Sequence, residues 1–370
     1  MSKKVTMLLT NGFDPDPRVY KEAVYLVDKG FLVTILCWDR DLSRNNQEDE
    51  YQDGIHIIRY KIPSVYGSGK KQIKAYLKYI ERCREYLKKN ESEYIHCNDL
   101  DGMIAGVLAS KKKSKLIFDM HELYEDVGKG KKLKRQILRY LTKYMIKKSY
   151  YSLYENDLYL KEAYASVRKK LMPLKNYPDS RLIAPKNKTK SSVFRIGYFG
   201  GLRMQLPQFR ALFEAVKEMR DVEVYIRGVG PDLDALQVLS KNYTNVKVGG
   251  VFDGTKELTE LYENIDIIYA GYRPDSDTRE CAEVVKFFEC ILTGTPLILT
   301  SCYISMAKRI EECGYGITCD TLNSDCIKKA IFKLKDDREF WKSCAINERR
   351  DAHLYDWNEA VKILDKIYRE

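Results

Sequence analysis

Short apolar segments alternate with amphipathic ones along nearly the whole chain, and this alternation restricts the fold more than any other feature of the sequence. Strand Lys4–Thr10, helix Arg18–Lys29 and strand Phe31–Cys37 form the first predicted strand–helix–strand unit. The alternation starts again at strand Arg195–Phe199, after the polar, aperiodic segment 179–193, which is typical of a linker. We therefore predict an α/β protein with two Rossmann-like, doubly wound parallel-sheet domains that face a cleft.

The domain boundaries follow from the same pattern. We expect an N-terminal domain at 1–178, a linker at 179–193, a C-terminal domain at 194–352 and a terminal helix within 353–370. Ligands of doubly wound sheets bind at the carboxyl ends of the strands, so the loops that follow the strands should line the cleft.

The composition is that of a soluble globular protein. Of 370 residues, 44% are hydrophobic and 32% are charged, which suffices for two cores. The longest apolar runs have the length of strands, far short of the roughly 20 residues of a membrane span. The opening Met-Ser-Lys-Lys shows no apolar signal sequence, so we expect a cytoplasmic protein.

The cysteines and histidines give no sign of disulfides or metal. The ten cysteines contain no Cys-x-x-Cys pair, and we expect reduced, largely buried thiols. The four histidines are not at metal-ligand spacing, and we predict no metal site; they are His56, His96, His121 and His353.

Positive charge is concentrated in the first half of the chain. Residues 1–193 hold 39 lysines and arginines against 24 acids, whereas the remainder holds 25 against 29. Segment 128–149 has nine basic residues, no acid, and apolar residues at helical spacing. Such a helix could bind an anionic membrane surface, gaining about 1 kcal/mol per basic residue near the surface. A solvated surface helix is the simpler interpretation, and no recognised motif favours nucleic-acid binding.

Segment 283–300 carries the clearest indication of a ligand site. Lys286 and Glu289 lie on one side of a predicted helix, which Gly294 ends and Pro296 keeps from resuming. A cation at the amino end of a helix suits a diphosphate, because the free N–H groups and the helix dipole also favour negative charge there. A carboxylate one turn further along can accept hydrogen bonds from both ribose hydroxyls. The pattern indicates a nucleotide-sugar site, and an ordinary surface Lys–Glu pair is the alternative.

A series of motifs resembles, in order and spacing, those of the GT-B glycosyltransferases of family four, which are retaining, nucleotide-sugar-dependent enzymes. The motifs of the first half are Asp16–Gly30, Cys97–Asp101, Phe118–Glu125 and Asn176–Pro178. Those of the second half are Ile196–Gly201, Ile226–Pro231, Val285–Glu289, Thr293–Pro296 and Tyr355–Trp357. The resemblance covers nearly the whole length. It implies an acceptor-binding first domain, a donor-binding second domain and a final helix that crosses back onto the first domain.

The resemblance also implies the donor-site residues. Glu289 would bind the ribose and Lys286 the diphosphate. Gly228 and Gly230 would let the nucleotide approach the backbone closely, although a tight strand–helix turn would also explain them. Val251 would contact the base through its backbone. The other residues implied on the donor side are Gly12, Gly200, Arg203 and Phe287.

On the catalytic side, the resemblance implies that His121 points at the transferred sugar, with Glu122 orienting its ring. A hydrogen-bonded structural histidine is the alternative. Arg203 is the second catalytic candidate. The acceptor-side candidates are Asp16, Arg18, Asn98 and Asp99. For Asp16, capping of the helix that begins near Arg18 is a competing role.

Two departures from the family pattern bear on activity. The family often carries a second glutamate eight positions before the ribose carboxylate, and Cys281, beside Glu280, stands at that position. The arginine that usually grips the diphosphate is replaced by Gly201. Arg203 or Arg273 could substitute, because a guanidinium can hold phosphate from several directions.

These observations together predict a hexosyltransferase of the cytoplasm, at the inner face of the cell membrane. It would move a sugar from a nucleotide-sugar, with UDP or GDP as the expected nucleotide, to a glycan or lipid-linked acceptor in cell-surface polysaccharide assembly. No cofactor beyond this co-substrate is expected. The alternatives are a nucleotide-sugar epimerase on the same fold and a non-catalytic GT-B partner subunit.

Overall fold

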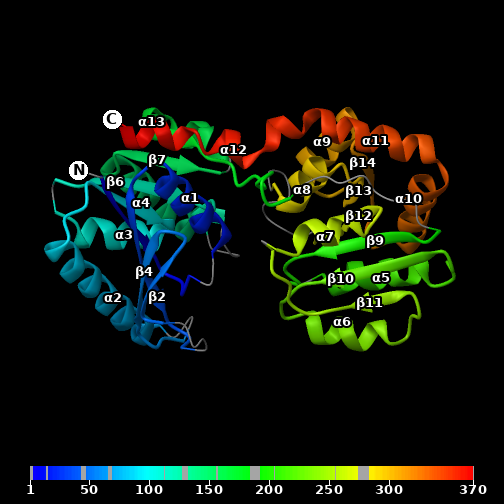
Figure 1. Cartoon of the computed structure of the whole chain (residues 1–370), viewed down its shortest axis with the longest axis horizontal. Coiled ribbons are helices and arrows are strands. Elements are labelled where there is room, and N and C mark those ends of the chain that lie inside the picture. Colours follow the sequence, from blue (N-terminus) through cyan, green and yellow to red (C-terminus); the bar gives the residue numbers. More distant parts are fainter. Residues whose placement is uncertain are drawn as a thin grey trace. The chain divides into compact units, whose positions relative to one another are not determined.

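The structure, a computed structural model, shows two compact units: residues 1–175 with 361–370, and residues 176–360 (Figure 1). The residues that it describes are 3–13, 16–42, 47–65, 69–111, 113–126, 132–155, 157–183, 192–203, 205–254, 256–273 and 283–369.

The first unit is built on an eight-stranded sheet with the order β3-β4-β2-β1-β5-β6-β7-β8. Its strands are β1 Lys4–Leu9, β2 Leu32–Asp39, β3 Asp49–Gln52, β4 Ile55–Lys61, β5 Tyr94–Asn98, β6 Lys115–Met120, β7 Tyr151–Tyr154 and β8 Leu171–Pro173. All neighbours pair in parallel except β3, which runs antiparallel to β4 at the edge. The central strand β5 is buried along its whole length, as expected when helices cover both faces of a parallel sheet.

Helices connect most of these strands. They are α1 Pro17–Asp28, α2 Lys70–Lys89, α3 Asp99–Ala109, α4 Lys132–Lys148 and α13 Ile363–Arg369, with short 3-10 helices η1 Tyr124–Asp126, η2 Asp157–Leu160 and η3 Glu162–Lys170. Asp16 caps α1 by accepting a hydrogen bond from the Val19 amide at 3.3 Å, and Pro17 follows at the first helical position. Residues 128–131 of the predicted basic helix lie outside the described residues, and the remainder forms α4.

The second unit is built on a six-stranded parallel sheet with the order β11-β10-β9-β12-β13-β14. Its strands are β9 Phe194–Phe199, β10 Val222–Arg227, β11 Val246–Val248, β12 Ile267–Ala270, β13 Leu297–Thr300 and β14 Gly316–Cys319. Its helices are α5 Leu206–Val216, α6 Leu233–Ser240, α7 Leu258–Glu263, α8 Val285–Thr293, α9 Ile304–Cys313, α10 Ser324–Asp336, α11 Arg338–Asp351 and α12 Trp357–Ala360, with the 3-10 helix η4 Ala352–Tyr355. The predicted α/β class with two doubly wound parallel sheets is therefore confirmed.

The unit boundaries differ from the predicted ones for a physical reason. The first unit ends at Lys175, and the chain returns to it at Val361 rather than at 353. The start of the predicted linker is held in the second unit, where Ser180 donates to Asp356 at 2.6 Å and the amide of buried Trp357 donates to Pro178 at 2.9 Å. Polarity and lack of periodicity do not reveal such contacts between segments far apart in sequence.

The terminal helix α13 packs into the first unit, where it is drawn in red (Figure 1). Its buried Tyr368 contacts the rings of Phe31 and Tyr94, with ring centroids 5.5 and 4.8 Å apart. Tyr94 also donates its hydroxyl hydrogen to the Tyr368 carbonyl at 3.0 Å. These contacts fix the last turn of the chain on the first sheet.

Candidate functional site

The amino end of helix α8 follows an apolar residue. Its N-cap residue, Val284, offers no capping side chain, and no acid lies in the first turn. Lys286 occupies that first turn, where a cation is unfavourable to the helix dipole unless an anion binds there. The helix ends at Gly294, whose φ of 61° is left-handed, as its sequence position predicted.

The ammonium group of Lys286 lies against the loop that follows β9. Its Nζ is 4.4 Å from the ring centroid of Tyr198. A Cβ atom added to Gly200 would stand 2.5 Å from this Nζ, so a side chain at 200 would displace the lysine. The Tyr198 hydroxyl donates to the carbonyl of Gly201 at 2.7 Å and steadies the same loop. The structure thus brings Lys286 and Gly200 together, as the donor-site prediction requires.

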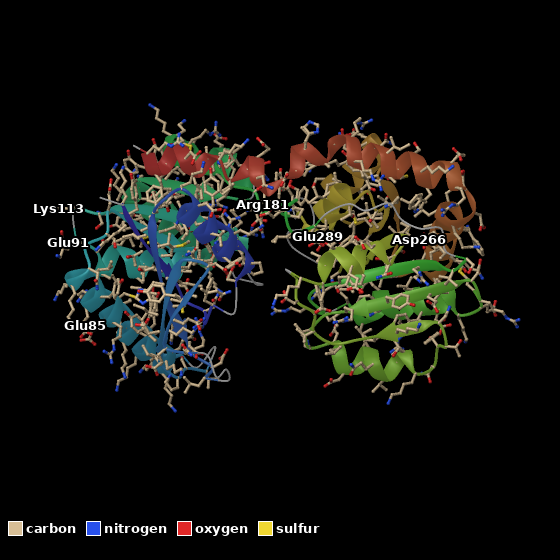
Figure 2. All side chains as sticks on the ribbon, viewed as in Figure 1. Glu85, Glu91, Lys113, Arg181, Asp266 and Glu289 are labelled. Atoms are coloured by element: carbon tan, nitrogen blue, oxygen red, sulfur yellow. The ribbon has the colours of Figure 1, made fainter. Side chains whose placement is uncertain are left out.

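Glu289, which is labelled in Figure 2, lies one turn further along α8. The hydroxyl of Tyr262, on α7, donates a hydrogen bond to Glu289 Oε2 at 2.7 Å. Burial, and then the charge of Glu289, raise the pKa of Tyr262 well above its ordinary value, so the phenol stays protonated and remains a donor. This contact fixes the carboxylate of a half-buried glutamate.

The glycines after β10 are needed for backbone packing. A Cβ at Gly228 would lie 1.8 Å from the carbonyl oxygen of Gly200, and one at Gly230 would lie 2.1 Å from that of Leu202. Both have a positive φ, 157° and 153°, which side-chain-bearing residues rarely adopt. The tight-turn explanation accounts for both, because their missing side chains make room for the β9 loop.

The other predicted donor residues have different surroundings. Val251 is 71% exposed, and its carbonyl accepts from Arg227 at 2.7 Å. Arg203 is exposed on the loop after β9. Phe287 is fully buried among Phe288, Tyr315 and other core residues, so its side chain serves the core, and its place in the donor site stays a prediction. Apolar residues next to a ligand-binding position commonly serve the core, and the motif alone does not separate the two roles. Glu280 and Cys281 lie outside the described residues.

In the first unit, the ring of His121 lies between two carboxylates. Its Nε2 is 2.7 Å from Asp119 Oδ2, and its Nδ1 is 3.4 Å from Asp99 Oδ2. Burial opposes protonation of the ring, but Asp119 and Asp99 outweigh it and raise the pKa of His121 to about 9. At neutral pH the ring is therefore a cation, and Asp119 and Asp99 take the orienting role predicted for Glu122.

The predicted acceptor-side role of Arg18 is wrong, because the side chain is buried. It is 4% exposed, and its guanidinium donates to both oxygens of Asp119, at 2.6 and 2.9 Å. It also contacts Glu22 at 3.2 Å and donates to the Leu174 carbonyl at 3.2 Å. Burial alone would raise the pKa of Asp119, but the charge of Arg18 acts against it, and the net effect holds this pKa well below its usual value. Arg18 thus fixes Asp119, which in turn binds the His121 ring.

Three more predicted residues take up structural positions. Asn98 is fully buried and donates to the Leu8 carbonyl at 3.2 Å, which contradicts its predicted contact with an acceptor. Asp16 is the cap of α1, the competing role. Gly12 lies in the loop after β1, where its carbonyl accepts from Arg59 at 3.1 Å. Its neighbour Asp14 lies outside the described residues.

Asp99 stands apart from these three because its backbone is strained. Its φ is 63°, unusual for a residue with a side chain, and it lies directly after β5. Its side chain is 37% exposed and accepts from the Tyr124 hydroxyl at 2.9 Å. Strain at an exposed carboxylate beside His121, at the carboxyl end of a parallel strand, is typical of a functional position.

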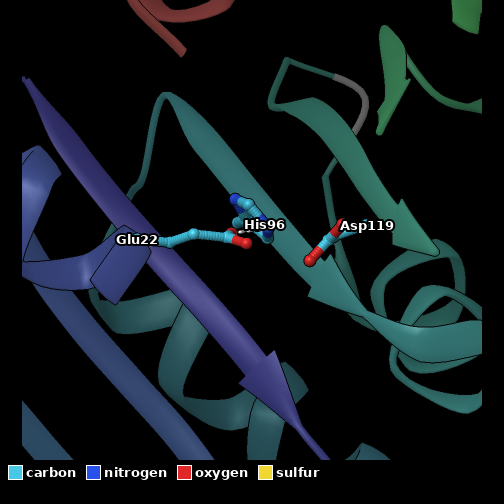
Figure 3. Close-up of side chains that lie close together, drawn as sticks. All are labelled: Glu22, His96 and Asp119. Carbon is cyan, nitrogen blue, oxygen red and sulfur yellow. Dashed lines mark ion pairs between the residues drawn. The ribbon is translucent and has the colours of Figure 1, made fainter. Parts of the chain in front are cut away.

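Glu22, His96 and Asp119 lie together in the core beneath this position (Figure 3). Each offers a ligand atom, and these atoms lie within 4.8 Å of one another, a grouping that spacing in the sequence did not show. Both oxygens of Asp119 are already bonded to Arg18, and one also to His121. The guanidinium therefore supplies the positive charge that a metal would bring, and the cluster is that of a buried ion-pair network.

Comparison with known proteins agrees with this architecture. Residues 18–154 match the family model Glycosyltransferase Family 4. No curated protein matches the sequence. Among solved structures, sucrose-phosphate synthase from Thermosynechococcus elongatus is 14% identical, with 99% of this chain and 98% of that one covered and a TM-score of 0.74. The chain has the GT-B fold.

Two further GT-B structures match over both units. HepE of Anabaena, solved in complex with UDP and glucose, is 14% identical over 99% of each chain, with a TM-score of 0.70. A glycosyltransferase from Rickettsia africae is 15% identical over 100% of this chain and 98% of that one, also with a TM-score of 0.70. The family match is confined to the first unit, and these structures show that the fold extends over both units.

Sequence reasoning missed two groups of this GT-B chain that touch predicted site residues. Asp119 is the next-to-last residue of β6 and lies two residues before His121, and its position was a usable signal. Tyr262 gave no signal, since it lies in an ordinary amphipathic helix 27 residues before Glu289. Only the packing of α7 against α8 brings its hydroxyl to the carboxylate.

Proposed function

We propose that this chain is a glycosyltransferase that moves a hexose from a nucleotide-sugar to a glycan or lipid-linked acceptor, with retention of configuration. The observation that carries the proposal is the amino-terminal turn and a half of α8. There Glu289, which Tyr262 fixes at 2.7 Å, would accept hydrogen bonds from the ribose. Lys286 lies over Gly200 on the same helix and would supply the cation that binds phosphate. A nucleoside diphosphate has the matching charges and hydroxyls.

Lys286 compensates for the departure at Gly201. The usual arginine is absent there, but the Lys286 ammonium lies over the preceding residue, Gly200. A cation beside the amino end of α8 would stabilise the leaving diphosphate as charge develops on it. This electrostatic role suits a retaining transfer in which the enzyme contributes no carboxylate nucleophile.

His121 would act as a cation and hydrogen-bond donor. With a pKa of about 9, the ring is doubly protonated at neutral pH and cannot serve as a general base there. Nε2 is committed to Asp119 at 2.7 Å, whereas Nδ1 is a longer 3.4 Å from Asp99. Nδ1–H is therefore the group available to a sugar oxygen.

The nucleotide to test first is UDP, which HepE binds in its solved complex. GDP is the second candidate. The reaction as proposed needs no resident cofactor, since the nucleotide-sugar brings its own leaving group.

We also propose that the protein acts at the inner face of the cell membrane in cell-surface polysaccharide assembly, and helix α4 supports this. Leu133, Ile137, Tyr140 and Tyr144 recur at three and four along it and are 67, 58, 75 and 43% exposed. Its sequence carries seven lysines and arginines and no acid. An apolar stripe flanked by positive charge matches an anionic lipid surface. No helix among the described residues has the length and apolarity needed to cross a bilayer.

A thermal-shift screen with UDP-, GDP-, ADP- and CMP-sugars, followed by transfer assays, tests the function. Selective binding raises the melting temperature by mass action, and a flat response to all four classes would contradict the proposal. Release of a free sugar or epimer without an acceptor would favour an epimerase. Selective binding with no turnover across an acceptor panel would favour a non-catalytic subunit.

A further inference from the structure

A continuous line of buried polar side chains connects the last helix of the chain to His121. We name its members, Tyr368, His96, Glu22, Arg18 and Asp119, the buried relay. Tyr368 Oη is 2.6 Å from His96 Nδ1, and His96 Nε2 is 3.1 Å from Glu22 Oε2. Glu22 Oε1 is 3.2 Å from Arg18 Nε, and the guanidinium then binds Asp119 through two hydrogen bonds. Asp119 is the residue that binds His121 Nε2.

The buried relay is withdrawn from water over its whole length. Glu22, His96 and Asp119 are 0% exposed, Tyr368 is 1% and Arg18 is 4% exposed. Charges in such surroundings are strongly unfavourable unless each is compensated by a partner. Here one guanidinium compensates two carboxylates, so its position depends on the charge of both.

The contacts of His96 indicate how its proton is placed. If the Tyr368 hydroxyl donates to Nδ1, the single proton of a neutral ring must stand on Nε2, which faces Glu22. Burial raises the pKa of Glu22, whereas the charge of Arg18 favours its anion. With the ring proton toward Glu22, the carboxylate lies between two groups that favour its negative charge.

We propose that Tyr368, His96 and Glu22 are positioning residues for His121, acting through the Arg18–Asp119 pair. The proposal rests on the role of His121 in the proposed function. It follows that the hydroxyl of Tyr368, on α13, contributes to the orientation and charge of the His121 ring together with the local sequence around that ring.

The physical coupling has a definite sign. Asp119 forms ion pairs with both Arg18 and His121, and Arg18 forms ion pairs with both Asp119 and Glu22. Removing the charge of Glu22 leaves Arg18 to neutralise Asp119 alone, and Asp119 then holds the His121 proton less tightly. Removing the Tyr368 hydroxyl frees His96 Nδ1. Without this hydrogen bond the ring holds the Glu22 carboxylate less firmly beside Arg18, which acts on the His121 proton in the same direction as loss of the Glu22 charge.

The variants Glu22→Gln and Tyr368→Phe in the full-length protein test the coupling, with Tyr94→Phe as a matched control. Tyr94 is also buried against α13 and bonds the Tyr368 carbonyl, but it lies outside the buried relay. The His121 ring is titrated by NMR without nucleotide, together with the pH profile of transfer. The other charged groups around the relay, Asp99 and Glu155, are unchanged.

We expect Glu22→Gln to lower the pKa of His121 by about 0.5 or more, Tyr368→Phe to lower it by a smaller amount, and Tyr94→Phe to leave it unchanged. The alkaline limb of the transfer profile should move by the same amount. A folded Tyr368→Phe variant, which lacks one oxygen atom only, with an unaltered His121 titration would overturn the proposal. The NMR readout needs no donor or turnover, so absence of transfer in the parent protein would contradict the proposed function without affecting this result.

Discussion

The hydroxyl of Tyr262 donates a hydrogen bond of 2.7 Å to Oε2 of Glu289, and thereby fixes the carboxylate that we assign to the donor ribose. Tyr262 is 2% exposed, so this hydrogen bond is shielded from water on the tyrosine side. A fixed acceptor loses little conformational entropy when a ribose binds. The pair therefore separates a binding residue, Glu289, from a positioning residue, Tyr262.

Substitutions in this pair should affect donor binding to different degrees. Glu289→Ala should weaken binding of the nucleotide-sugar by about a hundredfold, because two hydrogen bonds to a charged group are lost. Tyr262→Phe should weaken it by about fivefold, since the carboxylate is retained but no longer fixed. Isothermal titration calorimetry measures both. Tyr243→Phe, which removes a tyrosine–glutamate bond to Glu214 elsewhere in the unit, is the control. Equal affinity of parent and Glu289→Ala would refute the ribose assignment.

Lys286 should act on the diphosphate rather than on the nucleoside. We expect Lys286→Gln to weaken UDP binding by about tenfold or more and to leave uridine binding nearly unchanged, since a charge-assisted contact is lost only with the phosphates. Competition binding with UDP and uridine separates the two effects. Lys308→Gln on α9, whose partner is Glu312 at 3.6 Å, serves as the control. An equal loss for both ligands would instead indicate a general disturbance of α8.

Substitution by alanine should change the free energy of unfolding differently at two glycines, one in the loop after β9 and one in the loop after β10. At Gly228 a Cβ would stand 1.8 Å from the Gly200 carbonyl oxygen, so Gly228→Ala should lower the free energy of unfolding by about 2 kcal/mol or more. At Gly201 no atom lies within 4 Å of the added Cβ, and Gly201→Ala should change it by less than about 0.5 kcal/mol. Urea denaturation measures both. A stable Gly228→Ala variant would show that the two loops can separate.

The charge state of His121 predicts a pH dependence of stability. Its folded pKa, about 9, lies above its ordinary value of 6.5, so its contribution is fully present below pH 6.5 and is lost as the pH rises through 9. The loss should be on the order of 3 kcal/mol. Denaturant unfolding between pH 6 and 9.5 measures it, with His121→Gln as the comparison. If the variant loses stability with the same slope as the parent, another group is responsible.

Helix α4 should bind anionic vesicles. The protein should co-sediment with vesicles rich in anionic lipid, less so at high salt and not with neutral vesicles. Ile137→Glu should reduce binding several-fold, because it places a negative charge in the exposed apolar stripe. Ile346→Glu, at a 65% exposed position on α11, is the matched control. Equal binding of both variants would show that α4 is not the membrane contact.

Local signals predicted most of the helices and strands, including α8 and its end. Gly294 ends α8 in a left-handed conformation because few other residues adopt that φ without strain, and this follows from sequence position. The spacing of Lys286 and Glu289 likewise placed them on one side of a helix. The strands β3, β8 and β14 and helix α11 were not predicted. β3 is a polar, mostly exposed segment without clear alternation, and it forms by pairing with β4.

Charge and burial were harder to predict, because both depend on neighbours that are distant in sequence. Arg18 has the charge and the position of a ligand-binding residue. Only the packing of α1 against β6 shows that its guanidinium binds Asp119 instead. Phe287 lies beside Lys286 in one motif, but the helix turns its ring into the core.

The sequence by itself determined the two doubly wound sheets and helix α8, because hydrophobic period, glycine and proline act over a few residues. The tertiary structure alone decided which side chains hold Glu289 and His121. Tyr262 reaches Glu289 from another helix, and the buried relay reaches His121 from residue 368. Such contacts arise from packing across the fold, where a buried charge is stable only beside its partners.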